Sequence, residues 1–255
     1  MRFTETDNIQ MEAELAMRKH PESRVLSFTW QGERYWIKKK QSNHRKAFAK
    51  YSVEKEFYYE VAHITVAARA VDSAPEIVVL TDCYMVLRDS GSNVKDWLTS
   101  GIGDEEKCHI LQKAGEALAR LHEAGLYHGR PALRDMTWNG KRIVFLDWEN
   151  KTLYRDLPHR QIMDVILFFQ GMYREPWMNG RYAEAAWTGY ELAGGREVLD
   201  AACRFIRHHR LVYDICRMLH PFHFKDVESV ERLCRWMVKK SRLENEELGM
   251  AEHAE

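Results

Sequence analysis

The sequence has no excess of charge of either sign. Lysine and arginine number 38 and aspartate and glutamate number 38 among 255 residues, so the formal net charge at pH 7 is +0. Such a chain has no whole-molecule field that favours nucleic acid or an anionic membrane as its main partner. We therefore expect no nucleic-acid partner, and any affinity for an acidic ligand must come from a local group of basic side chains.

Long hydrophobic runs are also missing. Residues 1–30 carry charges throughout and hold no apolar segment of the about 7–15 residues that a secretory signal requires. No uncharged apolar run approaches the about 18 residues of a spanning helix. We expect a cytoplasmic globular protein without a transmembrane segment.

Cysteine is scarce and irregularly placed. The five cysteines are odd in number, widely separated and never arranged as C-x-x-C; they are Cys83, Cys108, Cys203, Cys216 and Cys234. This pattern suggests neither a disulfide framework nor a zinc site. Reduced thiols in the cytoplasm are the expected state.

The first third of the chain has the pattern of a small sheet with one helix. Two β-rich runs flank Gln31-Gly32-Glu33 within residues 24–40, which predicts a hairpin. Residues 44–64 contain no glycine or proline and place aromatic residues at helical spacing, which predicts a helix. Short strands are expected at residues 76–80 and 83–87.

The remainder has a mainly helical pattern after the turn-rich segment at residues 88–93. One hairpin interrupts it, because Asn139-Gly140 stands between two short apolar runs. The expected helices cover residues 94–100, 103–125, 159–173, 180–193, 196–219 and 226–243. We therefore predict an α+β protein with a strand-rich first part and a helical second part.

Residues 118–129, "LARLHEAGLYHG", are followed by a hairpin that ends in an aspartate. This combination resembles the protein-kinase-like superfamily, and the resemblance is closest to the lipopolysaccharide core (Kdo/heptose) kinase group of bacterial atypical kinases. It extends over about Val25 to Leu167. It implies a two-lobed fold, with an N-lobe at 1–89, a hinge near 88–92, a helical C-lobe at 90–245 and a frayed tail at 246–255.

Lys38 in "YWIK" matches the kinase-type lysine that holds the α- and β-phosphates of ATP. That lysine needs a carboxylate partner on the following helix. Glu54 and Glu56 are both candidates, and Glu54 is preferred because Phe57, Tyr58 and Val61 then follow at core spacing. The sequence has no G-x-G-x-x-G before Lys38, so the resemblance implies that another backbone segment, near residues 24–31, covers the phosphates.

The stretch "YHGRPALRD" corresponds to the catalytic loop H-x-D-x-x-x-x-N of kinases. By this resemblance His128 is the structural histidine and Asp135 is the metal-binding position. The usual catalytic aspartate is replaced by Arg130, whose guanidinium stays protonated and accepts no proton. Asp147 in "FLDWEN" stands where the metal-binding aspartate of D-F-G lies. Asp135 and Asp147 are thus the predicted ligands of Mg²⁺, since it prefers hard oxygen donors.

Asp164 lies on a predicted apolar helix and resembles the buried aspartate that braces the catalytic loop in kinase-like proteins. A lone carboxylate on such a face requires a partner. Its expected role is architectural.

An arginine at the position of the catalytic aspartate is compatible with three functions. The first is an active ATP- and Mg²⁺-dependent phosphotransferase, in which the arginine stabilises charge on the transferred phosphate. If the kinase motif is instead aligned on Leu133-Arg134-Asp135, Asp135 becomes the catalytic base, but Gly140 then stands at the position of the metal-binding asparagine. The second is a pseudokinase that binds nucleotide or a partner protein without turnover, and the third is transfer of another group, such as adenylyl, from ATP.

The resemblance favours the first function, with a hydroxyl of a lipopolysaccharide-core sugar or another envelope glycan as acceptor. The acceptor is then a small molecule or a glycolipid. Basic side chains from Lys38 to Lys50 would attract its anionic groups, and they permit peripheral contact with the inner membrane surface.

Overall fold

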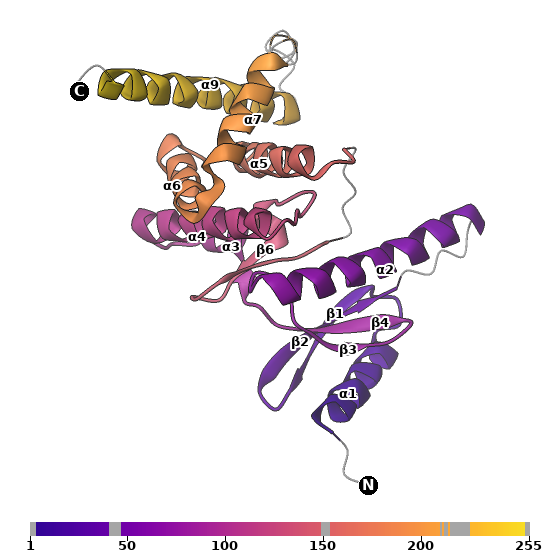
Figure 1. The fold of residues 1–255 in the computed structure, drawn as a ribbon. Helices are drawn as coiled ribbons and strands as arrows, with labels where there is room; N and C mark the ends of the chain where they lie inside the picture. The colour runs from indigo at the N-terminus through magenta and orange to yellow at the C-terminus, as the bar shows by residue number, and fades with distance from the viewer. Residues whose placement is uncertain are drawn as a thin grey trace. The chain divides into compact units, whose positions relative to one another are not determined.

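The structure is a computed structural model (Figure 1) that describes residues 4–40, 47–148, 154–209, 211, 214 and 225–252, except for the side chains of 47–54 and 241–252. The chain forms two compact units. The first comprises Met1–Ser92 and Thr137–Glu149, and the second comprises Asn93–Met136 and Asn150–Glu255. The protein is of the α+β class, with an antiparallel sheet in the N-terminal part and helices in the C-terminal part, as predicted.

The first unit is built on a four-stranded antiparallel sheet in the order β1-β2-β4-β3. Its strands are β1 (Val25–Trp30), β2 (Glu33–Lys39), β3 (Ile77–Leu80) and β4 (Tyr84–Arg88). The β1–β2 hairpin turns at Gln31 and Gly32, which both have positive φ, 49° and 84°. Two such residues form the tight turn that suits the twist of a hairpin, so this predicted hairpin is confirmed.

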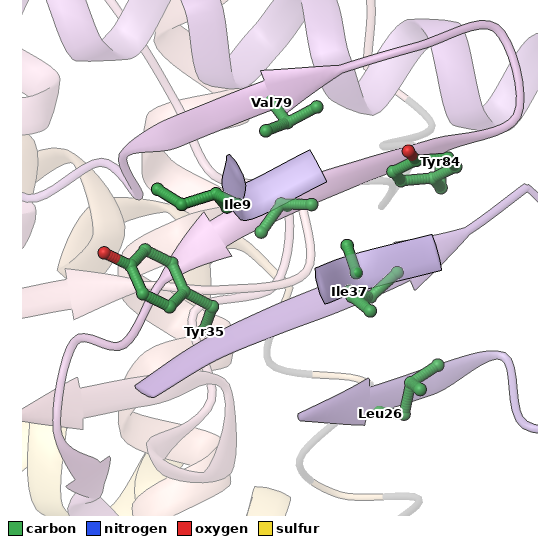
Figure 2. Close-up of a cluster of buried hydrophobic side chains, with 8 residues drawn as sticks. Ile9, Leu26, Tyr35, Ile37, Val79 and Tyr84 are labelled. Atoms are coloured by element: carbon green, nitrogen blue, oxygen red, sulfur yellow. The ribbon is translucent and has the colours of Figure 1, made fainter. Parts of the chain in front are cut away.

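Helix α1 (Glu5–Lys19) covers one face of this sheet and was not predicted. It begins with a capping box in which the Thr4 hydroxyl accepts from the Asp7 amide and the Asp7 side chain accepts from the Thr4 amide. Ile9 and Ala13 of α1 are buried against the sheet. Figure 2 shows this cluster, whose sheet members are Leu26, Tyr35, Ile37, Val79, Tyr84 and Val86.

Helix α2 (Ala47–Ala70) lies on the opposite side of the sheet from α1 (Figure 1). Strand residues alternate between the two faces. Ile37 therefore enters the cluster beneath α1, while Lys38 reaches the α2 side and contacts Glu60. Alternation along β2 thus delivers a lysine to the face that α2 covers.

A second, three-stranded sheet has the order β5-β6-β7 and consists of β5 (Ser92–Asn93), β6 (Met136–Trp138) and β7 (Ile143–Phe145). The predicted turn at Asn139-Gly140 connects β6 to β7, and the Asn139 side chain accepts from the amides of Lys141 and Arg142. The amide of Phe145 donates to the Ser73 carbonyl at 2.8 Å. This bond ties the end of β7 to the segment that follows α2.

The second unit is helical. It contains α3 (Val94–Thr99), α4 (Asp104–Glu123), the 3₁₀ turn η1 (Leu133–Asp135), α5 (Leu157–Tyr173), α6 (Gly180–Tyr190), a π-helical turn η2 (Glu191–Gly195), α7 (Arg196–His208) and α9 (Lys225–Glu252). Helix α9 extends into the stretch 246–255 that we predicted as a frayed tail, while residues 253–255 lie outside the described part.

Helices α4 and α6 approach each other backbone to backbone through two glycines. A Cβ atom on Gly115 of α4 would lie 2.0 Å from the Ala186 carbonyl oxygen of α6. A Cβ atom on Gly189 of α6 would lie 2.0 Å from the Gln112 carbonyl oxygen of α4. Each glycine therefore permits a contact that any side chain would prevent.

None of the described helices has the length and apolar character needed to cross a membrane. Cys83, Cys108, Cys203 and Cys234 are free thiols, and Cys216 lies outside the described residues.

Candidate functional site

In the first unit, Lys38 stands between two carboxylates that come from distant parts of the chain. Its Nζ lies 2.6 Å from Glu60 Oε1 and 3.4 Å from Asp147 Oδ1. The Glu60 side chain is 2% exposed and the Lys38 side chain 13%, whereas Asp147 is 30% exposed. An ammonium group is thus fixed near the surface, with its buried counter-charge behind it and a solvent-accessible carboxylate beside it.

Glu60 belongs to the buried face of α2. Three other buried residues of α2 lie at helical spacing from Glu60: Phe57 before it, and Ile64 and Ala67 after it. A carboxylate in such an apolar stripe requires a cation or several hydrogen-bond donors. Lys38 supplies that cation, so the pair is enforced by burial.

The predicted partner of Lys38 was Glu54 or Glu56, and the carboxylate that the structure brings to it is Glu60. The predicted core face comprised Phe57, Tyr58 and Val61. Phe57 is buried, but Tyr58 is 48% exposed and Val61 is half-buried. The buried stripe is therefore rotated from the predicted one and contains Glu60. Glu56 is half-buried one turn earlier on α2, and the side chain of Glu54 lies outside the described residues.

Replacing Glu60 by glutamine is expected to lower the free energy of unfolding by about 1–2 kcal/mol. The change removes the buried counter-charge of Lys38, but the amide oxygen still accepts a hydrogen bond and Lys38 keeps Asp147. Urea denaturation of the full chain measures the difference.

The matched control is Glu56→Gln, on the same helix and one turn away. We expect that variant to change the unfolding free energy by less than about 0.5 kcal/mol. Equal losses for the two variants, or a larger loss for Glu56→Gln, would show that Glu60 is not the residue that holds Lys38.

Asp147 lies in a strained turn directly after β7. Its φ is 63°, in the left-handed region that few residues other than glycine, asparagine and aspartate occupy. The next residue, Trp148, is 1% exposed and donates from its indole nitrogen to the Phe145 carbonyl at 2.8 Å. The anchored Trp148 fixes the turn, and with it the carboxylate next to Lys38.

In the second unit, Asp164 of α5 holds the loop that follows α4. Its carboxylate accepts from the backbone amides of His128 at 2.6 Å and Gly129 at 2.8 Å. Asp164 and His128 are both fully buried, and Gly129 has a φ of 97°. The predicted bracing role of Asp164 is confirmed, and Gly129 supplies the left-handed backbone that presents its amide.

His122 of α4 extends this network to α6. One ring nitrogen lies 3.3 Å from Asp164 Oδ2 and the other lies 2.5 Å from the Tyr190 hydroxyl. Burial, assisted by the charge of Asp164, raises the pKa of Tyr190, so its hydroxyl stays protonated within this hydrogen-bonded network. No motif marked Tyr190 in advance.

The same loop brings Arg130 and Asp135 together. The Ala132 amide donates to the Arg130 carbonyl at 2.9 Å and the Asp135 amide to the Ala132 carbonyl at 2.8 Å, which makes a compact turn. Arg130 Nη2 lies 3.7 Å from Asp135 Oδ2, and Arg134 Nε lies 3.6 Å from Asp135 Oδ1. Asp135 is therefore flanked by two guanidinium groups, one at each oxygen.

The two predicted metal ligands differ in how well they suit Mg²⁺. Asp147 is accessible and carries hard oxygens next to the lysine, so it suits a magnesium ion that accompanies phosphates. Asp135 is flanked by two cations, which would repel a divalent ion from the carboxylate in this arrangement. In the part of the chain that the structure describes, no group of three or more histidine, cysteine, aspartate or glutamate side chains could hold a metal ion.

The basic run that begins at Lys38 is only partly described. Lys39 Nζ donates to the carbonyls of His20 and Pro21 and so closes the C-terminal end of α1. Lys40 Nζ lies 3.4 Å from the Tyr58 hydroxyl. Residues 41–46, with His44, Arg45 and Lys46, lie outside the described residues, while the predicted phosphate-covering segment at 24–31 forms β1 and its turn.

No family model matches the chain. The chain is 27% identical over 239 residues to an uncharacterized protein of Haemophilus influenzae, and the alignment spans 92% of this chain and 98% of that protein. The similarity thus extends over nearly the whole of both sequences.

Proposed function

We propose that the protein is an ATP- and Mg²⁺-dependent phosphotransferase of the kinase-like fold. The observation that carries the proposal is the position of Lys38, held by buried Glu60 and lying 3.4 Å from accessible Asp147. A fixed ammonium beside a carboxylate suits the phosphates of a nucleotide and the magnesium ion that bridges them. In this proposal Lys38 binds phosphate oxygens, Glu60 positions Lys38, and Asp147 holds the metal, which would neutralise the developing charge.

The order of the elements supports the same proposal. A strand-rich segment with a lysine on β2 and a carboxylate on α2 precedes a loop braced by a buried aspartate and a hairpin that ends in Asp147. We propose on this basis the two-lobed division predicted from the sequence, with the hinge near residues 88–92. His128 would shape the loop that carries Arg130 and Asp135, the other two predicted catalytic residues.

The proposed acceptor is a hydroxyl of a lipopolysaccharide-core sugar or another envelope glycan, carried by a small molecule or a glycolipid. It rests on the resemblance of about Val25 to Leu167 to the lipopolysaccharide core kinases. The reaction would take place in the cytoplasm, with peripheral contact between the protein and the inner membrane surface when the acceptor is a glycolipid.

Thermal denaturation of the full chain with ATP and MgCl₂ tests the nucleotide site. At a ligand concentration about 100 times Kd, binding stabilises the folded state by about 2.7 kcal/mol, which raises Tm by about 5–10 °C in a chain of this size. Asp147→Asn is expected to remove the magnesium-dependent part of that rise, because an amide has no charge to offer the metal. Lys38→Met is expected to weaken ATP binding with or without magnesium.

Asp156→Asn is the matched control for the carboxylate, because Asp156 is exposed and caps α5. It should keep the full rise in Tm. Wild-type protein that gains no stability from Mg-ATP would refute both the phosphotransferase and a nucleotide-binding pseudokinase. An Asp147→Asn variant that binds Mg-ATP as wild type does would refute the site assignment alone.

A pseudokinase is the second candidate, and the Arg130–Asp135 ion pair is the observation that favours it. The position of the usual base is cationic, and its guanidinium faces the carboxylate predicted to bind metal. A protein that binds Mg-ATP but releases no ADP with glycan or protein acceptors would support this candidate. Release of ADP that depends on acceptor would exclude it.

A further inference from the structure

Arg130 and Arg134 give the loop after α4 a local surplus of positive charge. They lie at opposite oxygens of Asp135, at 3.7 Å and 3.6 Å, beyond ordinary hydrogen-bond distance. In the described part of the chain, Asp135 is the one carboxylate that forms an ion pair with either arginine. Two cations therefore share a single negative charge.

The exposure of the three side chains indicates where an additional anion would bind. The Arg130 and Arg134 side chains are 44% and 58% exposed, whereas Asp135 is 13% exposed. The carboxylate lies beneath and the guanidinium groups remain accessible to solvent. Planar guanidinium groups with several N–H donors suit the oxygens of phosphate.

A hydrogen-bond donor of Arg130 is also left without an acceptor. Its Nε–H is buried, and no acceptor for it exists among the residues that the structure describes. An unsatisfied buried donor costs about 1–3 kcal/mol. A ligand with several acceptor oxygens would allow Arg130 to adopt a conformer in which every N–H is bonded.

Hydrogen bonds to its backbone fix the loop that carries both arginines. The Asn93 side chain donates to the Arg134 carbonyl, and Asp164 accepts from the amides of His128 and Gly129. The Asp135 amide closes the turn onto Ala132. The two guanidinium groups are therefore presented by a rigid backbone, which lowers the entropic cost of binding.

We infer that Arg130 and Arg134 bind a phosphate group of the acceptor, so that the substrate is an already phosphorylated sugar. This inference rests on the proposed function and names its substrate class. The site holds the anion next to the loop where the transfer would occur. Asp135 positions the two guanidinium groups until the phosphate arrives.

Isothermal titration of the full chain with glucose 6-phosphate, without nucleotide, tests the inference, and glucose is the uncharged match. Wild-type protein is expected to bind the sugar phosphate and not the sugar. Arg130→Gln and Arg134→Gln should each weaken binding about tenfold, and the double variant should abolish it. Arg134→Lys should keep part of the affinity, since it keeps the charge.

Arg181→Gln is the matched control, because Arg181 is 53% exposed and paired with Glu105 away from the loop. It should bind glucose 6-phosphate as wild type does. Equal binding of glucose, or unchanged binding by the folded double variant, would overturn the inference.

A separate titration distinguishes the acceptor phosphate from the terminal phosphate of ATP. The double variant should keep the wild-type ratio of ATP to ADP affinity. If that ratio instead falls to one, the arginines bind the nucleotide and the acceptor assignment is wrong. Failure of Mg-ATP to bind wild-type protein would refute the proposed function. The glucose 6-phosphate titration is done without nucleotide, so it still shows whether the two arginines bind a sugar phosphate.

Discussion

Gly189→Ala is expected to destabilise the protein by more than about 3 kcal/mol. Its new methyl group would lie 2.0 Å from the Gln112 carbonyl oxygen and 2.7 Å from the Gln112 carbonyl carbon, both backbone atoms. No rotamer change relieves that overlap, so α4 and α6 would have to move apart. Gly115→Ala, on the facing helix, should give a loss of similar size.

Gly180→Ala is the control, because Gly180 begins the same helix and a Cβ atom there meets nothing within 4 Å. That variant should be neutral or gain up to about 1 kcal/mol from helix propensity. Urea denaturation of the three variants gives the comparison. A Gly189→Ala protein with wild-type stability would mean that α4 and α6 are further apart than described.

Asp164→Asn is expected to cost about 3 kcal/mol and to loosen the loop at His128 and Gly129. The carboxylate accepts both backbone amides, at 2.6 Å and 2.8 Å, and an asparagine offers one oxygen. Its NH₂ group would then face an N–H donor inside the core. The loss combines a weakened hydrogen bond with a buried donor left unsatisfied.

Two measurements separate this effect from general destabilisation. Hydrogen exchange at the amides of residues 128 and 129 should be faster in Asp164→Asn under conditions in which other buried amides remain protected. Asp156→Asn, at the cap of the same helix, should leave both exchange and stability unchanged, since asparagine and aspartate cap about equally well. Unchanged exchange in Asp164→Asn would contradict the bracing role.

The elements that depend on local signals were predictable from the sequence. Gln31-Gly32 and Asn139-Gly140 marked two hairpins because the backbone of each turn requires those residue types. That Asp164 has hydrogen-bond donors was predictable because a carboxylate within an apolar helical pattern requires them. That these donors belong to the loop at His128 and Gly129 was expected only from the resemblance to kinase-like proteins.

Features that depend on tertiary contacts were not predicted. Helix α1 begins with a local capping box, but it has few large apolar residues, so the sequence did not show that Ile9 and Ala13 pack on the sheet. The identity of the partner of Lys38 depended on which face of α2 is buried. Tyr58 was predicted to lie on that face but is exposed, whereas Glu60 is buried on it. Tyr190 joined the loop network through helix packing, which no spacing of residues revealed.

Tyr190 connects the kink between α6 and α7 to the braced loop. A Cβ atom on Gly195 would lie 2.0 Å from the Tyr190 ring, whose hydroxyl bonds to His122 and, through it, to Asp164. A substitution at the kink would therefore shift the ring and disturb the amides of His128 and Gly129 without touching them. The turn at Glu191–Gly195 is consequently a place where a substitution can alter the loop although every residue of the loop stays the same.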